Sequence, residues 1–167
     1  SRPAAPWPQL EEPAPEEQQI EMEIIGSFQT EMVDETPSDL FKLGTASLQV
    51  RIGGQEQQQM FVDLGAYAKQ ENPEFIRPGY PFVHLVAKDR SGKKTWHLQF
   101  YIDPIRMAVE KESLPVDHFC VWAMLIQGDP ESPEAQRRTF GVTGTFDMKQ
   151  FAGKIGGAVA GEFQLTT

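Results

Sequence analysis

Apolar and polar residues alternate along most of the chain that follows residue 19. Ile20, Met22 and Ile24 are separated by single glutamates, and the same period of two returns further on. The later alternating segments are residues 46–52, 60–64, 95–102 and 159–165. Successive side chains of a strand point to opposite faces of a sheet, so this alternation predicts half-buried β-strands.

Residues 118–126 break the alternation because their side chains are apolar at almost every position. Such a run predicts a central strand that is covered on both faces. Residues 82–87 and 140–146 complete a set of about eight strands, with spacings that are typical of β-sandwiches and barrels.

Three polar or glycine-containing segments predict turns. Gly53 and Gly54 predict a hairpin between 46–52 and 60–64, and residues 89–92 predict a second hairpin between 82–87 and 95–102. Residues 153–157 place a lysine among glycines but lack the spacing and the helix start of a phosphate-binding loop. We therefore interpret them as a third hairpin turn.

The alternation also predicts which way the aromatic side chains point. Trp96 is expected to face the core together with Leu98 and Phe100, whereas Tyr101 points to the opposite face. Phe61 is expected to point away from the core. An outward aromatic ring can stack on a sugar or on a partner's side chain, but packing against a second element is the preferred explanation.

The pattern predicts an all-β fold, an antiparallel β-sandwich of about eight strands with jelly-roll or Ig-like topology. A closed small barrel is the alternative. One or two short helices are expected, since Asp103 and Pro104 form a helix start before residues 105–111 and residues 36–39 precede Leu40. A single turn is also expected at residues 132–135.

Residues 65–81 are interpreted as an irregular loop, because Pro73, Pro78 and Gly79 interrupt them between predicted strands. A long loop with large side chains is often a recognition surface. Tyr67, Phe75 and Tyr80 are therefore candidate partner-binding residues.

Residues 1–19 form an acidic, proline-rich arm, and residues 20–167 form the sandwich domain. The formal net charge of the chain is −9, but residues 1–35 hold nine acids and one base, whereas the remaining 132 residues hold 15 acids and 14 bases. Proline-rich acidic chains favour extended conformations. The arm is either a solvated tail or a tether whose candidate contacts are Trp7, Leu10, Glu11 and Glu12.

Composition disfavours several classes of protein. No apolar run approaches the roughly 20 residues that span a bilayer, so no membrane-spanning segment is expected. The near-neutral body has no basic stripe for nucleic acid.

Cys120, the only cysteine, lies in an apolar run and is expected to be a buried thiol. The chain begins at Ser1 without an initiator methionine, which indicates either a cleaved signal peptide or a tag remnant. The first alternative implies the expected extracytoplasmic location, periplasmic or secreted.

Candidate chemistry is sparse. His84 and His97 lie in the two arms of the second predicted hairpin and can approach across it, but with His118 they lack the spacing of a metal motif. The carboxylates Asp63, Asp103 and Asp117 fall where strands end, which turn and capping roles explain. No cofactor and no catalytic residue are predicted.

Three functions follow in order of preference. The first is a non-catalytic accessory subunit or adaptor of a larger extracytoplasmic protein assembly, including one beside a membrane, with other protein subunits as partners. The second is a carbohydrate-type ligand-binding sandwich module that uses outward aromatics or the 65–81 loop. The third is a metal-dependent hydrolase built on the three histidines.

Overall fold

The computed structural model describes residues 21–58, 60–71, 80–103, 106, 109, 113–117, 120–129, 132, 133 and 136–167. These residues form eleven strands and one short helix, which confirms the all-β prediction. The elements are β1 (Met22–Val33), α2 (Leu40–Leu43), β2 (Thr45–Ile52), β3 (Gln55–Glu56), β4 (Phe61–Glu71), β5 (Tyr80–Asp89), β6 (Thr95–Ile102), β7 (Leu114–Val116), β8 (Val121–Gln127), β9 (Arg138–Gly141), β10 (Thr143–Phe151) and β11 (Ala158–Thr166).

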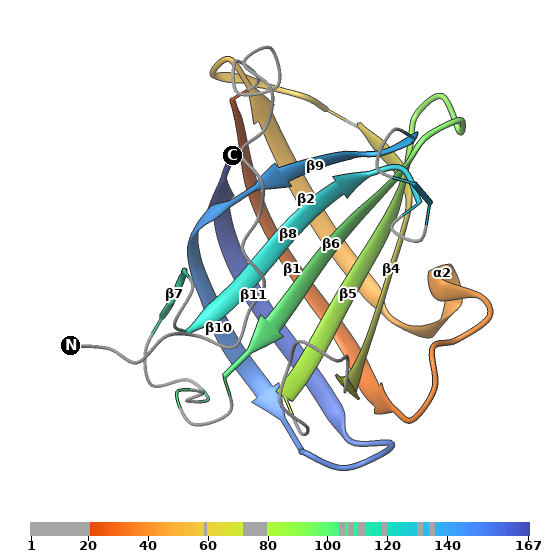
Figure 1. Cartoon of the computed structure of the whole chain (residues 1–167), viewed down its shortest axis with the longest axis vertical. Helices are drawn as coiled ribbons and strands as arrows, with labels where there is room; N and C mark the ends of the chain where they lie inside the picture. Colours follow the sequence, from red (N-terminus) through yellow and green to blue (C-terminus); the bar gives the residue numbers. More distant parts are fainter. Residues whose placement is uncertain are drawn as a thin grey trace.

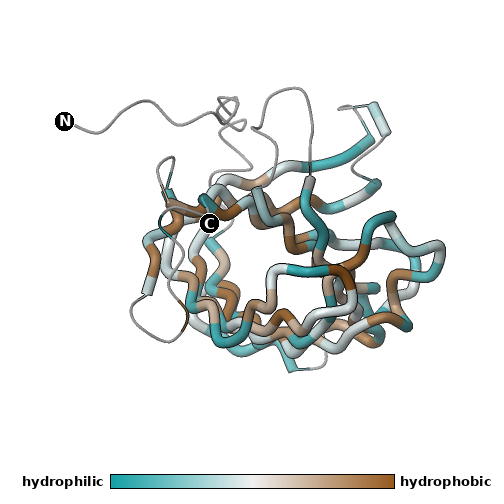
Figure 2. Tube along the Cα trace, turned by 90° about the horizontal axis from the view of Figure 1, so that it is seen from below, coloured by the Kyte–Doolittle hydropathy of each residue, from teal (hydrophilic) through white to brown (hydrophobic). Residues whose placement is uncertain are grey.

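All eleven strands belong to one mixed sheet, in the order β11-β10-β7-β8-β6-β5-β4-β1-β2-β3, with β9 beside β8. Most pairings are antiparallel, but β1 also pairs with β4 in parallel through Met32 and Val33, and β7 pairs in parallel with β8. Strand β1 additionally pairs with β11, so the path of pairings returns to its starting strand. The sheet therefore curves round on itself and encloses one core (Figures 1 and 2).

The inward side chains of the sheet form one hydrophobic core. Phe100, Phe146 and Phe163 are almost fully buried at its centre, and the Phe100 ring centroid lies 5.0 Å from that of Phe146 and 5.1 Å from that of Phe163. Gly26 lies opposite these rings, where an added Cβ would stand 2.5 Å from the Phe163 ring. The glycine thus leaves the space that a large aromatic side chain fills.

Strand β6 confirms the predicted directions of its side chains. Trp96, Leu98 and Phe100 belong to the core, whereas Tyr101 lies on the outer face of the sheet. Residues 121–126 of β8 are buried on both faces apart from the half-buried Met124, as the apolar run predicts. His118 and Phe119, the first residues of that run, lie outside the described residues.

The turn predictions are confirmed, with one change of partner. Gly53 and Gly54 have φ of +60° and +79° and join Ile52 to Gln55 in a tight turn. The returning strand is the two-residue β3, however, and β4 pairs with β5 and β1 instead of with β2. The turns at 89–92 and 153–157 join β5 to β6 and β10 to β11.

Residues 65–71 and 80–81 belong to β4 and β5, so the interpretation of 65–81 as an irregular loop is wrong for these positions. The two strands pair antiparallel from Phe61 and Asp89 to Glu71 and Tyr80. Pairing with β5 provides backbone hydrogen-bond partners for residues 65–71. Strand β4 therefore continues past the small and polar residues at which the sequence pattern predicted its end. Residues 72–79 lie outside the described part of the chain.

Helix α2 confirms the helix expected after residues 36–39. The side chain of Asp39 accepts a hydrogen bond from the backbone N–H of Phe41 at 3.2 Å, which is the role of an N-cap. The helix lies on the outer face of β4 at Gly65, where an added Cβ would stand 2.1 Å from the Leu40 carbonyl oxygen.

The other two predicted helices are described only in part, and each shows a hydrogen bond of a single turn. The backbone N–H of Arg106 donates to the Asp103 carbonyl oxygen, and that of Gln136 donates to the Pro133 carbonyl oxygen.

Candidate functional site

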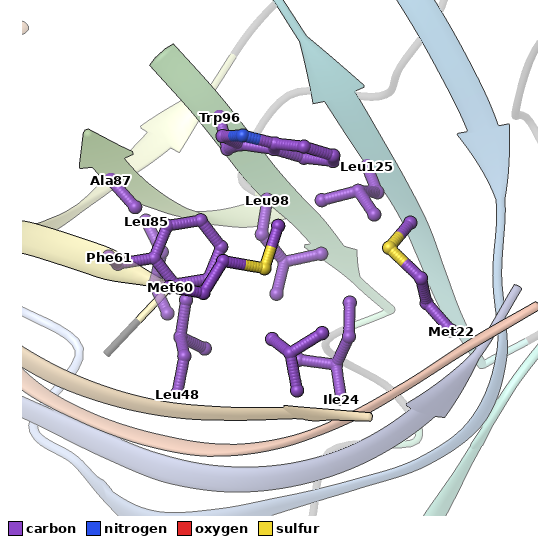
Figure 3. Close-up of a pocket in the computed structure, with 11 residues that line it drawn as sticks. Met22, Ile24, Leu48, Met60, Phe61, Leu85, Ala87, Trp96, Leu98 and Leu125 are labelled. Atoms are coloured by element: carbon purple, nitrogen blue, oxygen red, sulfur yellow. The ribbon is translucent and has the colours of Figure 1, made fainter. Parts of the chain in front are cut away.

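An apolar pocket lies inside the sheet at the end where β4 and β6 begin and where β2, β5 and β8 end (Figure 3). Its free volume is about 20 Å³, which is room for about one water molecule. The lining side chains are all apolar except for one indole N–H: Met22, Ile24, Leu48, Val50, Met60, Phe61, Leu85, Ala87, Trp96, Leu98 and Leu125.

Phe61 reaches this pocket because of an irregularity at the start of β4. The pairing of β4 with β5 shifts register between Phe61 and Asp63, so one extra residue interrupts the ladder. A bulge of this kind redirects the side chains beside it. Phe61 consequently packs edge-on against Trp96, with ring centroids 6.2 Å apart, while Val62 is 55% exposed. The prediction that Phe61 points away from the core is therefore wrong.

Two methionines reach into the pocket from opposite sides. Figure 3 shows the thioether of Met60 beside Phe61 and Leu48, and that of Met22 on the far side beneath Leu125. Methionine has three rotatable bonds and fills irregular space easily. Their side chains can therefore rearrange to enlarge the pocket more cheaply than branched side chains could.

Three of the lining residues connect the pocket to the surface. Leu48, Met60 and Phe61 are half-buried, whereas the residues deeper in the lining, such as Leu85 and Leu98, are almost inaccessible to solvent. Entry is therefore possible between the beginning of β4 and the middle of β2.

The opposite, outer face of the wall formed by β4, β5, β6 and β8 carries a second buried cluster. We call it the outer aromatic cluster, and its members are Tyr67, Tyr80, Phe82, Tyr101 and Trp122. Leu40 and Leu43 of α2 pack against it, together with Val33 and Met124. The sequence suggested Tyr101 as an outward ring for sugar stacking, but it is only 7% exposed because it packs between Phe82 and Trp122.

Of the candidate partner-binding residues, Tyr67 and Tyr80 lie in the outer aromatic cluster and are buried. The structure thus brings these two together on neighbouring strands and away from solvent. Trp7, Leu10, Glu11, Glu12 and Phe75 lie outside the described residues, so their proposed role stays a prediction.

A hydrogen-bonded histidine pair lies beside the outer aromatic cluster. His84 Nε2 lies 2.8 Å from His97 Nδ1, and His84 Nδ1 lies 3.1 Å from the Tyr67 hydroxyl oxygen, which confirms that the histidines approach across the hairpin. Burial, the neighbouring His97 and Lys69 lower the pKa of His84 to about 3. Burial lowers the pKa of His97 to about 4, against the opposing effect of Asp129. Both rings are therefore neutral at neutral pH, and one of them donates to the other.

This pair does not extend to a recognisable metal centre in the described part of the chain. No group of three or more His, Cys, Asp or Glu side chains there is placed to hold a metal ion. His118, the third member of the hypothesised metal site, lies outside the described residues.

Two of the three candidate carboxylates have structural roles, whereas Asp63 lies exposed within β4 and not at a strand end. Asp117 accepts a hydrogen bond from the Cys120 N–H at 2.9 Å, and Asp103 pairs with Arg106. Cys120 is buried, which confirms the prediction for its thiol.

Comparison with protein-family models, with curated protein sequences and with solved structures found no match to this chain. No helix among the described residues has the length and apolar character needed to cross a membrane.

The sequence interpretation missed the pocket as a site. The signal available was the adjacent pair Met60 and Phe61, which interrupts strict alternation at a strand start and so is consistent with a bulge. That signal does not say which side chains stand across from the pair, because residues of β1, β2 and β8 complete the lining.

Proposed function

We propose that this protein binds a small apolar molecule in the pocket at the β4 and β6 end of the sheet, without acting on it chemically. The observation that supports this proposal is the lining itself, which is apolar apart from one indole N–H and which includes side chains that reach the surface. Concave, mostly apolar sites with few polar groups are the usual setting for small-molecule binding.

The chemistry of the lining argues for binding rather than catalysis at this place. General acid–base and nucleophilic mechanisms need titratable or nucleophilic side chains in reach of the bound molecule. The described lining supplies thioethers, alkyl groups and aromatic rings. A charged ligand would lose its hydration there without compensation, so the ligand is a neutral molecule.

The expected affinity is moderate. Removing apolar surface from water contributes about 25 cal/mol per Å², so a ligand that buries roughly 300 Å² gains on the order of 7 kcal/mol. The free volume of about 20 Å³ admits such a molecule only after Met22 and Met60 move, and this rearrangement and the loss of motional freedom offset part of the gain. We therefore expect micromolar rather than nanomolar dissociation constants.

The test is calorimetric titration with butylbenzene, a neutral molecule without hydrogen-bonding groups. Leu48→Glu places a charge at the half-buried edge of the pocket and is expected to weaken binding at least ten-fold. Ile25→Glu is the matched control, because Ile25 is 48% exposed on the neighbouring strand β1 and does not line the pocket. Saturable binding that Ile25→Glu retains and Leu48→Glu loses supports the proposal, and no binding by the unaltered protein rejects it.

An accessory-subunit role is a second proposal, and it is compatible with the first. It is supported by the uneven charge, since residues 1–35 hold nine acids and one base while the rest of the chain is nearly balanced. Deleting residues 1–19 is expected to leave the melting temperature of the body within a few degrees and to abolish co-purification with a partner. Unchanged co-purification would argue against the arm as a tether.

A further inference from the structure

The turn between β5 and β6 gathers positive charge in a chain that is otherwise acidic. Residues 88–94 hold four bases and one acid, a net charge of +3, whereas the formal net charge of the whole chain is −9. Subtracting this +3 from −9 leaves a net charge of −12 on all other residues. Arg90, Lys93 and Lys94 are exposed at the end of the turn. We call these three residues the basic tip.

The basic tip stands at the end of the sheet where the apolar pocket opens. Ala87 and Trp96 pair across β5 and β6 and both line the pocket, so the turn that joins these strands extends beyond it (Figure 1). The backbone N–H of Arg90 donates to the Met60 carbonyl oxygen at 2.9 Å. Met60 is one of the half-buried residues at the pocket entrance. This hydrogen bond holds the basic tip beside that entrance.

Apolar side chains border the basic tip on the surface. Val62 is 55% exposed at the bulge of β4, and the neighbouring Phe61 pairs with Asp89 of the turn. Phe61 and Met60 are only half-buried. Lysine and arginine beside exposed apolar side chains are the combination that peripheral proteins present to an anionic bilayer. The two kinds of side chain therefore form one surface that suits a layer of lipid headgroups.

The acids near the basic tip leave its end positive. Asp89 is half-buried, and its carboxylate accepts hydrogen bonds from the Ser91 hydroxyl at 2.6 Å and from the backbone N–H of Lys94 at 3.4 Å. Asp63 and Asp129 are exposed, but they lie beside the base of the turn and not at its end. Charges are screened over about 8 Å at physiological ionic strength, so acids in more distant parts of the chain do not cancel the basic tip.

We infer that this end of the protein docks on an anionic membrane surface, with the basic tip among the lipid headgroups and Val62 in the interface below them. The inference rests on the proposed function, because apolar molecules partition into bilayers and the docked pocket opens toward that reservoir. An acidic protein segment would match the basic tip alone, whereas a bilayer interface matches both the charges and the exposed apolar side chains.

The experiment measures sedimentation of the unaltered protein with vesicles of phosphatidylcholine alone and with vesicles in which about a third of the lipid is phosphatidylserine. Binding is expected with the anionic vesicles only. It should disappear in about 1 M salt, where charges are screened over about 3 Å. Lys93→Gln with Lys94→Gln is expected to weaken binding about 25-fold, since each base contributes roughly a factor of five near an anionic surface.

The matched control is Lys149→Gln with Lys154→Gln, which removes the same charge from β10 and from the turn that follows it. Both lysines are exposed, and this variant is expected to bind as the unaltered protein does. Val62→Ser tests the apolar contact and is expected to weaken binding about three-fold. Ile155→Ser is its control, because Ile155 is 61% exposed in the turn between β10 and β11, and it should leave binding unchanged.

Three results would overturn the inference. The first is no binding of the unaltered protein to the anionic vesicles, and binding to soluble polyglutamate in its place would assign the basic tip to an acidic protein partner. The second is an equal loss in the two double variants, because total charge would then explain it. The third is undiminished binding of Val62→Ser, since the apolar contact is what distinguishes a bilayer from an acidic protein. None of these samples contains butylbenzene, so docking and the calorimetric test of the pocket can fail separately.

Discussion

The two walls of the sheet differ in what their outer faces carry. In the wall of β1, β2, β10 and β11, buried residues alternate with exposed ones, and its outer face holds shallow depressions lined by small and polar side chains such as Ser27, Ser47 and Glu162. In the wall of β4, β5, β6 and β8, both faces are buried over most of the length of β5, β6 and β8. We call these the polar wall and the aromatic wall.

The comparison teaches that one sheet can serve two kinds of packing. The polar wall contributes one face to the core and leaves the other in water, which is the ordinary condition of an antiparallel sheet. The aromatic wall stands between two buried layers, the core on its inner side and the outer aromatic cluster on the other. Substitutions on the two outer faces should therefore have very different consequences.

The largest expected effect separates the two outer faces directly. Phe82→Ala, in the outer aromatic cluster, is expected to lower the free energy of unfolding by about 3–5 kcal/mol, because it leaves a cavity among Tyr67, His84 and Tyr101. Gln164→Ala, on the exposed face of β11 in the polar wall, should change it by less than about 0.5 kcal/mol. Chemical denaturation measures both. Similar small losses at the two positions would show that the outer aromatic cluster is not a second core.

The next effect is a pH dependence that belongs to the aromatic wall. His84 and His97 have folded-state pKa values of about 3 and about 4, below their ordinary value of 6.5. Between these values and 6.5 the unfolded state binds more protons than the folded state, so stability falls as the pH falls through this window. The two histidines together are expected to remove about 2–4 kcal/mol between pH 7 and pH 5.

Denaturation curves at several pH values test this dependence. The variant His84→Gln with His97→Gln lacks both rings and should lose a large part of the slope between pH 5 and pH 6.5, although the carboxylates still titrate. A double variant with the slope of the unaltered protein would mean that the histidines take up protons as readily in the folded state as in the unfolded state.

A smaller effect concerns the close packing of side chains against the inner face of the polar wall. Gly26→Ala would place a Cβ 2.5 Å from the Phe163 ring and 2.7 Å from Leu48, and is expected to cost about 1–3 kcal/mol through overpacking. Gly141→Ala is the matched control, since an added Cβ there meets no atom within 4 Å. The control should be neutral or slightly stabilising. Equal melting temperatures for the two variants would contradict the packing described for Gly26.

The smallest effect tests the helix that covers part of the aromatic wall. Asp39→Ala removes the N-cap of α2 and should cost about 1 kcal/mol, whereas Asp39→Asn retains an accepting side-chain oxygen and should cost less. Thermal unfolding of both variants provides the measurement. A loss that Asp39→Asn does not recover would assign the effect to the charge of Asp39 and to its ion pair with Lys42.

Local patterns predicted the strands well where alternation was strict. The predicted strands at 46–52, 95–102 and 159–165 lie within β2, β6 and β11, because each of these segments presents one apolar face to the core. The predicted strand at 140–146 is divided, since Phe140 belongs to β9 beside β8 and Phe146 to β10 beside β11. Periodicity runs through Val142 without a break and cannot show this exchange of partners.

The candidate site was less predictable than the strands. The approach of His84 and His97 followed from the hairpin register, which a local turn sets. The pocket depends on a bulge at Phe61 and on side chains from β1, β2, β4, β5, β6 and β8, and no local pattern relates these strands to one another. The burial of Tyr101 likewise depends on residues of neighbouring strands and could not be inferred from its own strand.

The sequence by itself determined the all-β character of the chain, the positions of its main turns and the inward faces of its alternating strands. These properties follow from side-chain periodicity and backbone conformation, which are local. The tertiary structure alone decided that the outer face of the aromatic wall is buried, that Phe61 turns inward and that Trp96 lines an apolar pocket. Burial and hydrogen-bond satisfaction are set by whichever distant residues arrive beside a side chain, and strand order and register determine those residues.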